Sequence, residues 1–455
     1  MPRPLTVIAH ADVLVLMDEA GTEIADGAIA FRHGALVKVG TSADLAAEIA
    51  VASEVIDARG CVVTPGLVNT HHHLYQTLTR AVPAGTDASL FGWLKALYPI
   101  WARYRPEDVY AATQLGLAEL ALSGCTTSSD HLYLFPNGVR LEDTIAAAET
   151  IGLRFHATRG AMSVGESMGG LPPDALVEAE PAILADTVRV IDMFHDATDG
   201  AMVRIGVAPC SPFSVSEGLM RDAAMLARDK RVMLHTHLAE DRDDVAFSLE
   251  RFGCRPGDYA ERLGWTGSDV WHAHCVQLDD AEIGLFARTG TGVAHCPSSN
   301  CRLGSGIAPV RAMLDAGVRV GLGVDGSASN DAGNLLAEAR QALLLQRVAN
   351  GADALGTRAA LRLATRGGAE VLGRHDCGSL EVGRRADIAV WDMGDIASTG
   401  AWDLVAALVL APPPRARDVF VDGRAVVREG ELVRVSRGEV LQAARRSLTR
   451  LMEAA

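Results

Sequence analysis

The sequence predicts an α/β fold, a (β/α)8 barrel joined to a composite β-sandwich that is built from both ends of the chain. Three observations support this prediction. Eight short apolar segments recur through the middle of the chain, with helix-like stretches between most of them. Histidines and an aspartate stand where several of these segments end. Both ends of the chain are rich in β-branched, strand-like runs.

The N-terminal region, residues 1–62, is typical of short strands joined by turns. Its strand-like runs alternate apolar and polar residues or are rich in β-branched ones, and glycine marks the bend of the second run. The runs are 5–17, 27–40 and 53–63. We expect this region to form the first part of the β-sandwich.

The middle of the chain, residues 63–374, repeats a strand and then a helix. Segments that are apolar almost throughout are typical of buried parallel strands, and the stretches at 106–124 and 334–350 are helix-like. Eight repeats favour a barrel over the alternative, a doubly wound sheet. The expected strands are 62–69, 126–130, 153–159, 202–209, 231–237, 269–275, 292–297 and 318–325.

The C-terminal region, residues 375–455, returns to strand-like runs, with a hairpin turn predicted at Asp422-Gly423. A final helix is expected at about 437–453. We expect this region to complete the β-sandwich.

Composition limits the partners and the compartment of the protein. The chain has 455 residues, a net charge of -15 and eight cysteines without CxxC spacing. Such an acidic surface repels phosphate backbones, so a nucleic-acid polymer is not expected as a partner. The scattered cysteines, the absence of a signal-peptide pattern and the lack of a roughly 20-residue apolar run predict a reduced, cytoplasmic protein without a membrane span.

Histidines lie at the ends of the predicted barrel strands, where barrel enzymes carry their chemistry. The first strand ends in three of them. Residues i and i+2 of a strand point to the same side, so we expect His71 and His73 to face the interior and His72 to point away. Two imidazoles at this spacing are half of a zinc-type site. His237, which ends the fifth strand, and Asp325, which ends the eighth, complete the predicted ligand set.

The other histidines are expected to play lesser parts. His235 and His272 share the inward direction of their neighbours but lie deeper, so we interpret them as core or supporting groups. His295 fits either a substrate contact or a structural role. No site role is predicted for His10, His33, His131, His156, His195 and His375.

Glu240 follows His237 by three residues in the segment HTHLAE. A carboxylate there could reach a water held by the metal. The alternative is an exposed loop carboxylate, and spacing alone does not separate the two.

Several motifs together resemble the amidohydrolase superfamily. They are PGLVNTHHH (65–73), HTHLAE (235–240), HAHC (272–275), HCPSSNCRLGSGIAP (295–309), GLGVDGSASND (321–331) and GSLEVGRRADIAVWD (378–392). The resemblance covers nearly the whole chain. It implies the same barrel with a composite β-sandwich, a small heterocyclic substrate and a homo-oligomer.

Other segments resemble the deaminase branch of this superfamily. They are HHHLYQTLTRAVP, FGWLKALYPIWARY, CTTSSDHLYLFPN and TRGAMSVGESMGGLPPD. They are similar to deaminases of 8-oxoguanine and also to hydroxyatrazine-type aminohydrolases. The resemblance implies hydrolysis of 8-oxoguanine to urate and ammonia. Hydroxyatrazine-type, guanine or isocytosine aminohydrolases are the alternatives. A non-catalytic assembly protein on the same scaffold is a remote one, because such relatives have lost ligands that this sequence keeps.

The resemblance also implies how many metal ions are bound. Binuclear relatives bridge two ions with a lysine or glutamate that ends the fourth strand, but here that strand ends near Pro209 and Cys210. Lys38, Lys95 and Lys230, the only lysines, lie elsewhere. We therefore expect one divalent ion, zinc as the first choice with iron as the alternative. Cys210 is expected to line the substrate pocket.

Catalytic roles follow from the same resemblance. Glu240 is expected to take a proton from the attacking water and to deliver it to the adjacent ring nitrogen. His274 is expected to hydrogen-bond the attacking oxygen or the developing charge. Asp325 is expected to pass the second proton to the leaving amine.

Three further features are candidates for substrate binding. Gln76, three residues beyond His73, either contacts the ring or serves as a capping or surface amide. Arg159, which ends the third strand, is a second candidate for substrate contact. The aromatic insertion between Trp93 and Trp101 fits either a lid over a flat ring or an interface.

Overall fold

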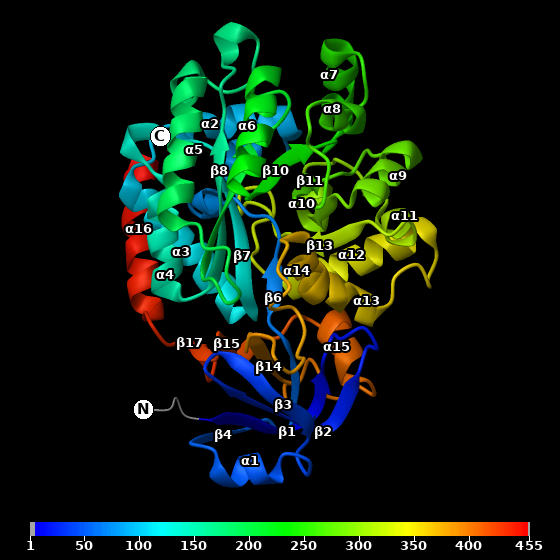
Figure 1. Cartoon of the computed structure of the whole chain (residues 1–455). Helices are drawn as coiled ribbons and strands as arrows, with labels where there is room; N and C mark the ends of the chain where they lie inside the picture. Colours follow the sequence, from blue (N-terminus) through cyan, green and yellow to red (C-terminus); the bar gives the residue numbers. More distant parts are fainter. Residues whose placement is uncertain (1–4, 454–455) are drawn as a thin grey trace.

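The computed structural model describes residues 5–453, and eight parallel strands form a barrel at its centre (Figure 1). The predicted fold class is confirmed. The strands follow one another around the barrel in chain order. They are β6 (Leu67–Asn69), β7 (Cys125–Leu132), β8 (Arg154–Ala161), β9 (Val203–Pro209), β10 (Met233–Leu238), β11 (Val270–His274), β12 (Gly292–His295) and β13 (Arg319–Leu322).

Backbone hydrogen bonds bring the last strand back to the first. The amide of Thr70 donates to the carbonyl of Leu322 at 2.9 Å, and the amide of Asp325 donates to the carbonyl of His71 at 3.1 Å. Every residue of β7, β8, β11 and β12 is buried, as expected for strands with helices outside and side chains inside. Closure places the ends of β6 and β13, and thus two of the predicted ligand-bearing segments, side by side.

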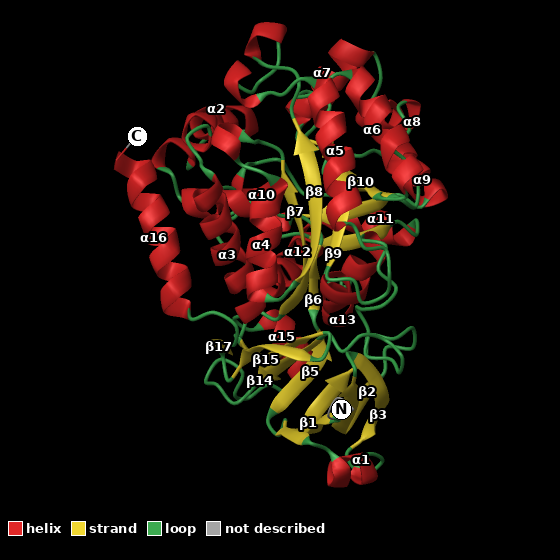
Figure 2. Ribbon diagram, turned by 60° about the vertical axis from the view of Figure 1, so that its left-hand side comes forward, coloured by secondary structure: helices red, strands yellow, loops and turns green. Residues whose placement is uncertain are grey.

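Helices surround the barrel and join its strands (Figure 2). The longer ones on the barrel are α3 (Pro106–Leu122), α4 (Leu141–Ile151), α5 (Glu180–Phe194), α6 (Glu217–Lys230), α9 (Asp280–Thr289) and α12 (Leu335–Asn350). The shorter ones are α7 (Arg242–Phe252), α8 (Pro256–Arg262), α10 (Pro297–Arg302), α11 (Val310–Asp315), α13 (Thr357–Arg362) and α14 (Gly368–Val371). No helix within residues 5–453 is both long and apolar enough to cross a membrane.

A nine-stranded sheet from both ends of the chain lies below the barrel in Figure 1. Its strands are β1 (Thr6–Val15), β2 (Glu23–Arg32), β3 (Ala35–Thr41), β4 (Glu54–Asp57), β5 (Cys61–Pro65), β14 (Ile388–Asp392), β15 (Ala416–Val421), β16 (Arg424–Arg428) and β17 (Glu431–Leu432). β14 pairs antiparallel with β5, which joins the two terminal regions directly. The helix α1 (Ala46–Val51) packs on β1 of this sheet, whereas α15 (Leu404–Leu410) contacts the barrel helices α12 and α13.

The run expected as one strand at 62–69 is divided between the two sheets. β5 belongs to the nine-stranded sheet and β6 to the barrel, and the chain crosses between them at Gly66. A side chain at Gly66 would bring a Cβ within 2.1 Å of the side chain of Thr126, so the crossing requires glycine.

The last helix, α16 (Arg437–Glu453), leaves the sheet and lies along α3 of the barrel (Figures 1 and 2). The guanidinium of Arg450 pairs with the buried carboxylate of Asp108 in α3. The terminal segment therefore stabilises the barrel as well as the sheet.

Candidate metal centre and active site

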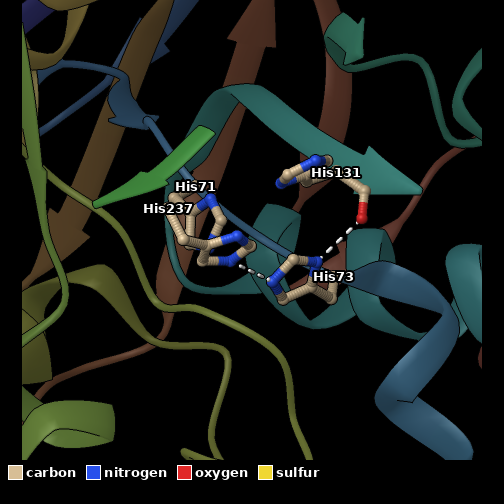
Figure 3. A group of neighbouring side chains, drawn as sticks. All are labelled: His71, His73, His131 and His237. Atoms are coloured by element: carbon tan, nitrogen blue, oxygen red, sulfur yellow. Dashed lines mark hydrogen bonds between the residues drawn. The ribbon is translucent and has the colours of Figure 1, made fainter. Parts of the chain in front are cut away.

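Four predicted ligands converge at the C-terminal mouth of the barrel. His71 and His73 follow β6, His237 lies in β10, and Asp325 follows β13. The Nε2 atoms of His73 and His237 are 3.0 Å apart. The Oδ1 atom of Asp325 lies 3.3 Å from Nε2 of His71 and 3.5 Å from Nε2 of His73. Figure 3 shows the three imidazoles facing one another.

Hydrogen bonds determine which nitrogen carries the proton in two of these imidazoles. Nδ1 of His73 donates to the carbonyl of His131 at 2.7 Å, and Nδ1 of His237 donates to the carbonyl of Cys210 at 2.6 Å. A carbonyl only accepts, so each Nδ1 holds the hydrogen and each Nε2 presents a lone pair in the neutral ring. Two such lone pairs directed at each other at 3.0 Å are suited to bind one cation between them.

His71 is oriented in the same way, through a second histidine. Nδ1 of His235 donates to the carbonyl of Trp271 at 3.0 Å, which leaves Nε2 of His235 as an acceptor. That atom lies 2.8 Å from Nδ1 of His71. Nδ1 of His71 is therefore the donor, and its buried Nε2 has no hydrogen-bond partner among residues 5–453.

These residues fit one divalent cation. Burial lowers the pKa of His71, His73 and His237, that of His237 to about 3, so all three rings are neutral ligands at pH 7. Burial acts to raise the pKa of Asp325, yet that pKa lies well below its usual range, so the carboxylate is ionised and available to a cation. Three neutral imidazoles and a carboxylate are a donor set typical of catalytic zinc. The groups that accept the Nδ1 hydrogens, two backbone carbonyls and Nε2 of His235, are the outer partners that orient such ligands.

The carboxylate of Asp325 is held in place by its neighbours. Its Oδ2 accepts hydrogen bonds from the hydroxyls of Ser299 and Ser329, at 2.6 and 3.1 Å. Its Oδ1, the atom nearest the imidazoles, accepts the amide of Gly326 at 2.7 Å. The carboxylate is thus aimed at the imidazoles before any ion binds.

Glu240 and His274 stand together beside the ligands. Glu240 is only 5% exposed, so it is no surface carboxylate. Its Oε2 lies 3.6 Å from Nε2 of His274, and that nitrogen is 3.9 Å from Oδ2 of Asp325. Nδ1 of His274 donates to the amide oxygen of Asn300 at 2.9 Å, so its Nε2 faces the site unprotonated in the neutral ring. Burial, with the charge of Asp325, raises the pKa of Glu240 well above its usual value.

The backbone is strained where these side chains emerge. Ala239, His274 and Asp325 have positive φ angles of 51°, 69° and 61°. Left-handed conformations cost a non-glycine residue on the order of 1–3 kcal/mol and gather at functional sites. Each lies at or just after the end of a barrel strand, where the turn aims a side chain at the centre of the mouth.

A hollow opens above the ligands. It is lined by His73, Gln76, Leu90, Trp93, Leu94, Tyr98, Tyr133, Cys210, Ser211, Phe213, His237, Glu240, His274, Leu303, Asp325 and Ser329. Four of these come from α2 (Leu90–Trp101), the aromatic insertion after β6. The indole of Trp93 donates to the carbonyl of Ala328 at 3.0 Å, which ties α2 to the loop after β13. Within one chain α2 therefore forms part of the wall of the hollow.

Gln76 and Cys210 both line this hollow. Nε2 of Gln76 lies 3.3 Å from the hydroxyl of Tyr75, and its buried Oε1 has no partner among the described residues. A Cβ at Gly326 would come within 1.9 Å of that oxygen, so glycine makes room for the amide. Burial raises the pKa of the Cys210 thiol to about 12. Cys210 thus stays protonated and is unsuited to be a metal ligand.

Arg159 does not join the hollow. It points outward from β8, and its guanidinium pairs with Glu178 at 2.8 Å and Asp186 at 3.0 Å. His72 also points away, toward α3, where a Cβ at Gly116 would lie 3.8 Å from its Nε2. We assign neither residue to the substrate.

His131 is the residue that the sequence interpretation missed. Its ring stacks on that of His237 with centroids 5.0 Å apart, and its ligand atom lies among those of His71, His73 and His237 (Figure 3). Nε2 of His131 donates to the carbonyl of Ala208 at 2.9 Å, and its Nδ1 has no partner among the described residues. Its position, directly after the second predicted strand, is the feature of the sequence that could have indicated a site residue.

The chain is similar to known metal-dependent hydrolases. The model of the Amidohydrolase family matches residues 62–426. The chain is 50% identical to 8-oxoguanine deaminase of Pseudomonas aeruginosa over 82% of this chain and 84% of the relative. It is 38% identical to hydroxydechloroatrazine ethylaminohydrolase of Pseudomonas sp. strain ADP, over 95% and 92%. The crystal structure of atrazine chlorohydrolase from Arthrobacter aurescens TC1 with zinc superposes with a TM-score of 0.92 at 34% identity, over 97% and 100%.

Proposed function

The chain belongs to the Amidohydrolase family and is a hydrolytic deaminase of heterocycles, and from this premise we propose that its substrate is 8-oxoguanine, which it converts to urate and ammonia. One observation carries the reaction: three imidazoles and a carboxylate converge beneath a hollow that also contains Glu240 and His274. The 50% identity to an 8-oxoguanine deaminase supports the choice of substrate.

The proposed mechanism assigns proton transfers to three side chains. A zinc ion held by His71, His73, His237 and Asp325 would lower the pKa of water toward 7. Glu240 takes one proton from the attacking water and gives it to the ring nitrogen beside the attacked carbon. Nε2 of His274 accepts a hydrogen bond from the attacking water and so orients the oxygen that adds to that carbon.

The exocyclic amine leaves in the second half of the reaction. The attacked carbon lies between two ring nitrogens, and its bond to the amine breaks as the new C–O bond becomes a carbonyl. Oδ2 of Asp325 passes the second water proton to the amine, which departs as ammonia. One water is consumed for each urate and ammonia formed.

Substrate recognition is proposed for Gln76, Cys210 and α2. The free Oε1 of Gln76 can accept an N–H of the ring. Trp93 and Tyr98 offer aromatic surface to a flat heterocycle. Arg159 has no part in this proposal, because its guanidinium is engaged by carboxylates.

A triazine is the second candidate substrate. The chain is 38% identical to a hydroxydechloroatrazine ethylaminohydrolase, and its fold matches that of an atrazine chlorohydrolase. A hollow lined by apolar and aromatic side chains accepts either ring.

A panel assay tests the proposal. The purified protein is incubated with 8-oxoguanine, guanine, isocytosine, isoxanthopterin and hydroxyatrazine, while ammonia release and ultraviolet absorbance are followed. We expect the largest kcat/KM with 8-oxoguanine and one divalent ion per chain by metal analysis. If 8-oxoguanine is inert while another ring turns over, the substrate assignment is wrong. Turnover by fully metal-free protein would contradict the role of the metal.

A further inference from the structure

A second cavity lies at the opposite end of the barrel from the metal centre, around the N-terminal ends of β9, β10 and β11. It encloses about 610 Å³ of space, part of it open to solvent. Its lining residues are His156, His195, Ala197, Arg204, Arg231, Val232, Met233, Ser268, Asp269 and Gly373. None of these residues belongs to the hollow above the metal ligands.

Two buried donors in this cavity have no protein partner. His156 in β8 is 1% exposed, and neither of its ring nitrogens has a hydrogen-bond partner among residues 5–453. Arg204 is its register partner on β9, so the two side chains emerge next to each other. The buried Nε of Arg204 likewise has no partner within the described chain. Leaving such groups unpaired is costly, on the order of 1–3 kcal/mol each.

Hydrogen bonds with the backbone hold Arg204 and His195 in place in the cavity wall, and Nη2 of Arg204 donates to the carbonyls of Ala197 and Thr198 at 3.5 and 3.4 Å. Nη1 of Arg204 donates to the carbonyl of Gly373 at 3.1 Å, which holds the guanidinium in place. Nδ1 of His195 accepts the amide of Ile205 at 3.1 Å, so Nε2 carries the hydrogen of the neutral ring. The wall thus presents several N–H groups together.

No acid forms a direct ion pair with the arginines that line the cavity, within the described part of the chain. The described residues place no carboxylate within ion-pair distance of Arg204 or Arg231. Asp269, the one acid in the lining, is engaged by Arg228 at 3.0 Å. Asp376, Asp199 and Asp196 also act on Arg204 from beyond ion-pair distance, and Asp376 is engaged by Arg374 at 2.9 Å.

We propose that this cavity is a binding site for a small oxyanion, with inorganic phosphate as the representative ligand. The anion would accept hydrogen bonds from Nε of Arg204, Nε2 of His195 and one ring N–H of His156, and Arg231 would add charge at the entrance. Charge-assisted bonds of this kind are the strong ones in proteins. The chain as a whole carries a net charge of -15. A cavity lined by two arginines is therefore unusual on this acidic protein.

Calorimetric titration of the purified holoenzyme with phosphate tests the site, at constant pH and with chloride balancing the ionic strength. We expect saturable binding in the wild type. Arg204→Gln should raise Kd roughly tenfold or more, because it removes a charged donor. Arg231→Gln should raise Kd by a smaller factor, and as an exposed position it carries the test if R204Q loses its fold.

Arg221→Gln is the matched control. Arg221 is an exposed arginine on α6, ten residues before Arg231, and its partner is Glu217 rather than the cavity. The same loss of charge should leave Kd for phosphate unchanged. The proposal is overturned if the wild type shows no saturable binding. It is also overturned if R204Q and R231Q both bind phosphate as the wild type does, since the anion would then lie elsewhere, for example at the metal.

Discussion

At the scale of single residues, the metal centre depends on which nitrogen of each imidazole holds its proton. His73 and His237 donate Nδ1–H to backbone carbonyls, which mutation cannot readily remove. His71 depends instead on a side chain, Nε2 of His235. That side chain is therefore the one outer partner of a ligand imidazole that substitution can test directly.

We predict that His235→Phe weakens metal binding. Phenylalanine keeps a flat ring against Trp271, with which His235 now stacks at 4.4 Å, but cannot accept the Nδ1–H of His71. Loss of such an outer partner typically costs about 10- to 100-fold in metal affinity. Competition with a chelator measures the change in metal affinity.

His272→Phe is the control, since His272 donates to the carbonyl of Trp265 and makes no hydrogen bond to a metal-ligating side chain among the described residues. Equal affinities in all three proteins would refute the role of His235.

The carboxylate of Glu240 is the second residue whose role can be isolated. Glu240→Gln keeps the shape and removes the proton acceptor, so we expect the metal to stay bound while kcat falls about a hundredfold or more. Steady-state rates and metal content are measured on the same preparation. Glu250→Gln, an exposed change of the same kind on α7, should be without effect. Wild-type turnover in Glu240→Gln would remove Glu240 from the mechanism.

At the scale of elements, strand periodicity predicted much of the site. The two-residue repeat directed His71 and His73 inward, and the structure brings both to His237 and Asp325. The same argument would have included His131 near the end of β7. The signal is weaker there, because no second histidine stands two positions from His131.

Other element-scale features were beyond the sequence pattern. The run at 62–69 fits a single strand by its apolar character, which does not reveal that its residues enter two different sheets. Arg159 ends a predicted strand, but its outward direction follows from the register of β8 and from its ion pairs with Glu178 and Asp186. Glu178 and Asp186 lie 19 and 27 residues beyond Arg159, so the pattern of the strand itself does not indicate them.

The helix α2 gives a prediction at this scale. Trp93→Phe keeps an aromatic ring in the hollow and removes the hydrogen bond to Ala328 that ties α2 to the loop after β13. Such a bond contributes about 1 kcal/mol, so we expect kcat/KM to fall severalfold through a higher KM, with metal content unchanged. Trp402→Phe, at a fully exposed position, is the control. A fall in kcat alone, with KM unchanged, would argue against a role for α2 in substrate binding.

At the scale of the whole molecule, buried ion pairs join the sheet to the barrel. The guanidinium of Arg154, at the start of β8, is fully buried and lies 2.6 Å from Asp387, just before β14, and 3.1 Å from Asp422, at the turn after β15. Positions more than 200 residues apart thus share one network, which no local sequence pattern indicates. Removing one member of such a pair leaves a buried charge unpaired and costs more than the pair itself contributes.

A second buried pair, Arg374 with Asp376, makes stability depend on pH. Burial acts to raise the pKa of Asp376, but Arg374 and the amide of Gly200 outweigh it and hold the pKa below its ordinary value of 3.8. The folded state therefore binds fewer protons here than the unfolded chain. This contribution to stability is complete above pH 3.8 and is lost as pH falls through the folded-state pKa.

Asp376→Asn should lower the free energy of unfolding at pH 7 by about 3 kcal/mol, because it leaves the buried Arg374 unpaired. It should also flatten the decline of that free energy below pH 3.8. Urea unfolding at a series of pH values measures both effects, with the exposed Asp353→Asn as control. An acid decline as steep in Asp376→Asn as in the wild type would show that other carboxylates govern acid unfolding of the molecule.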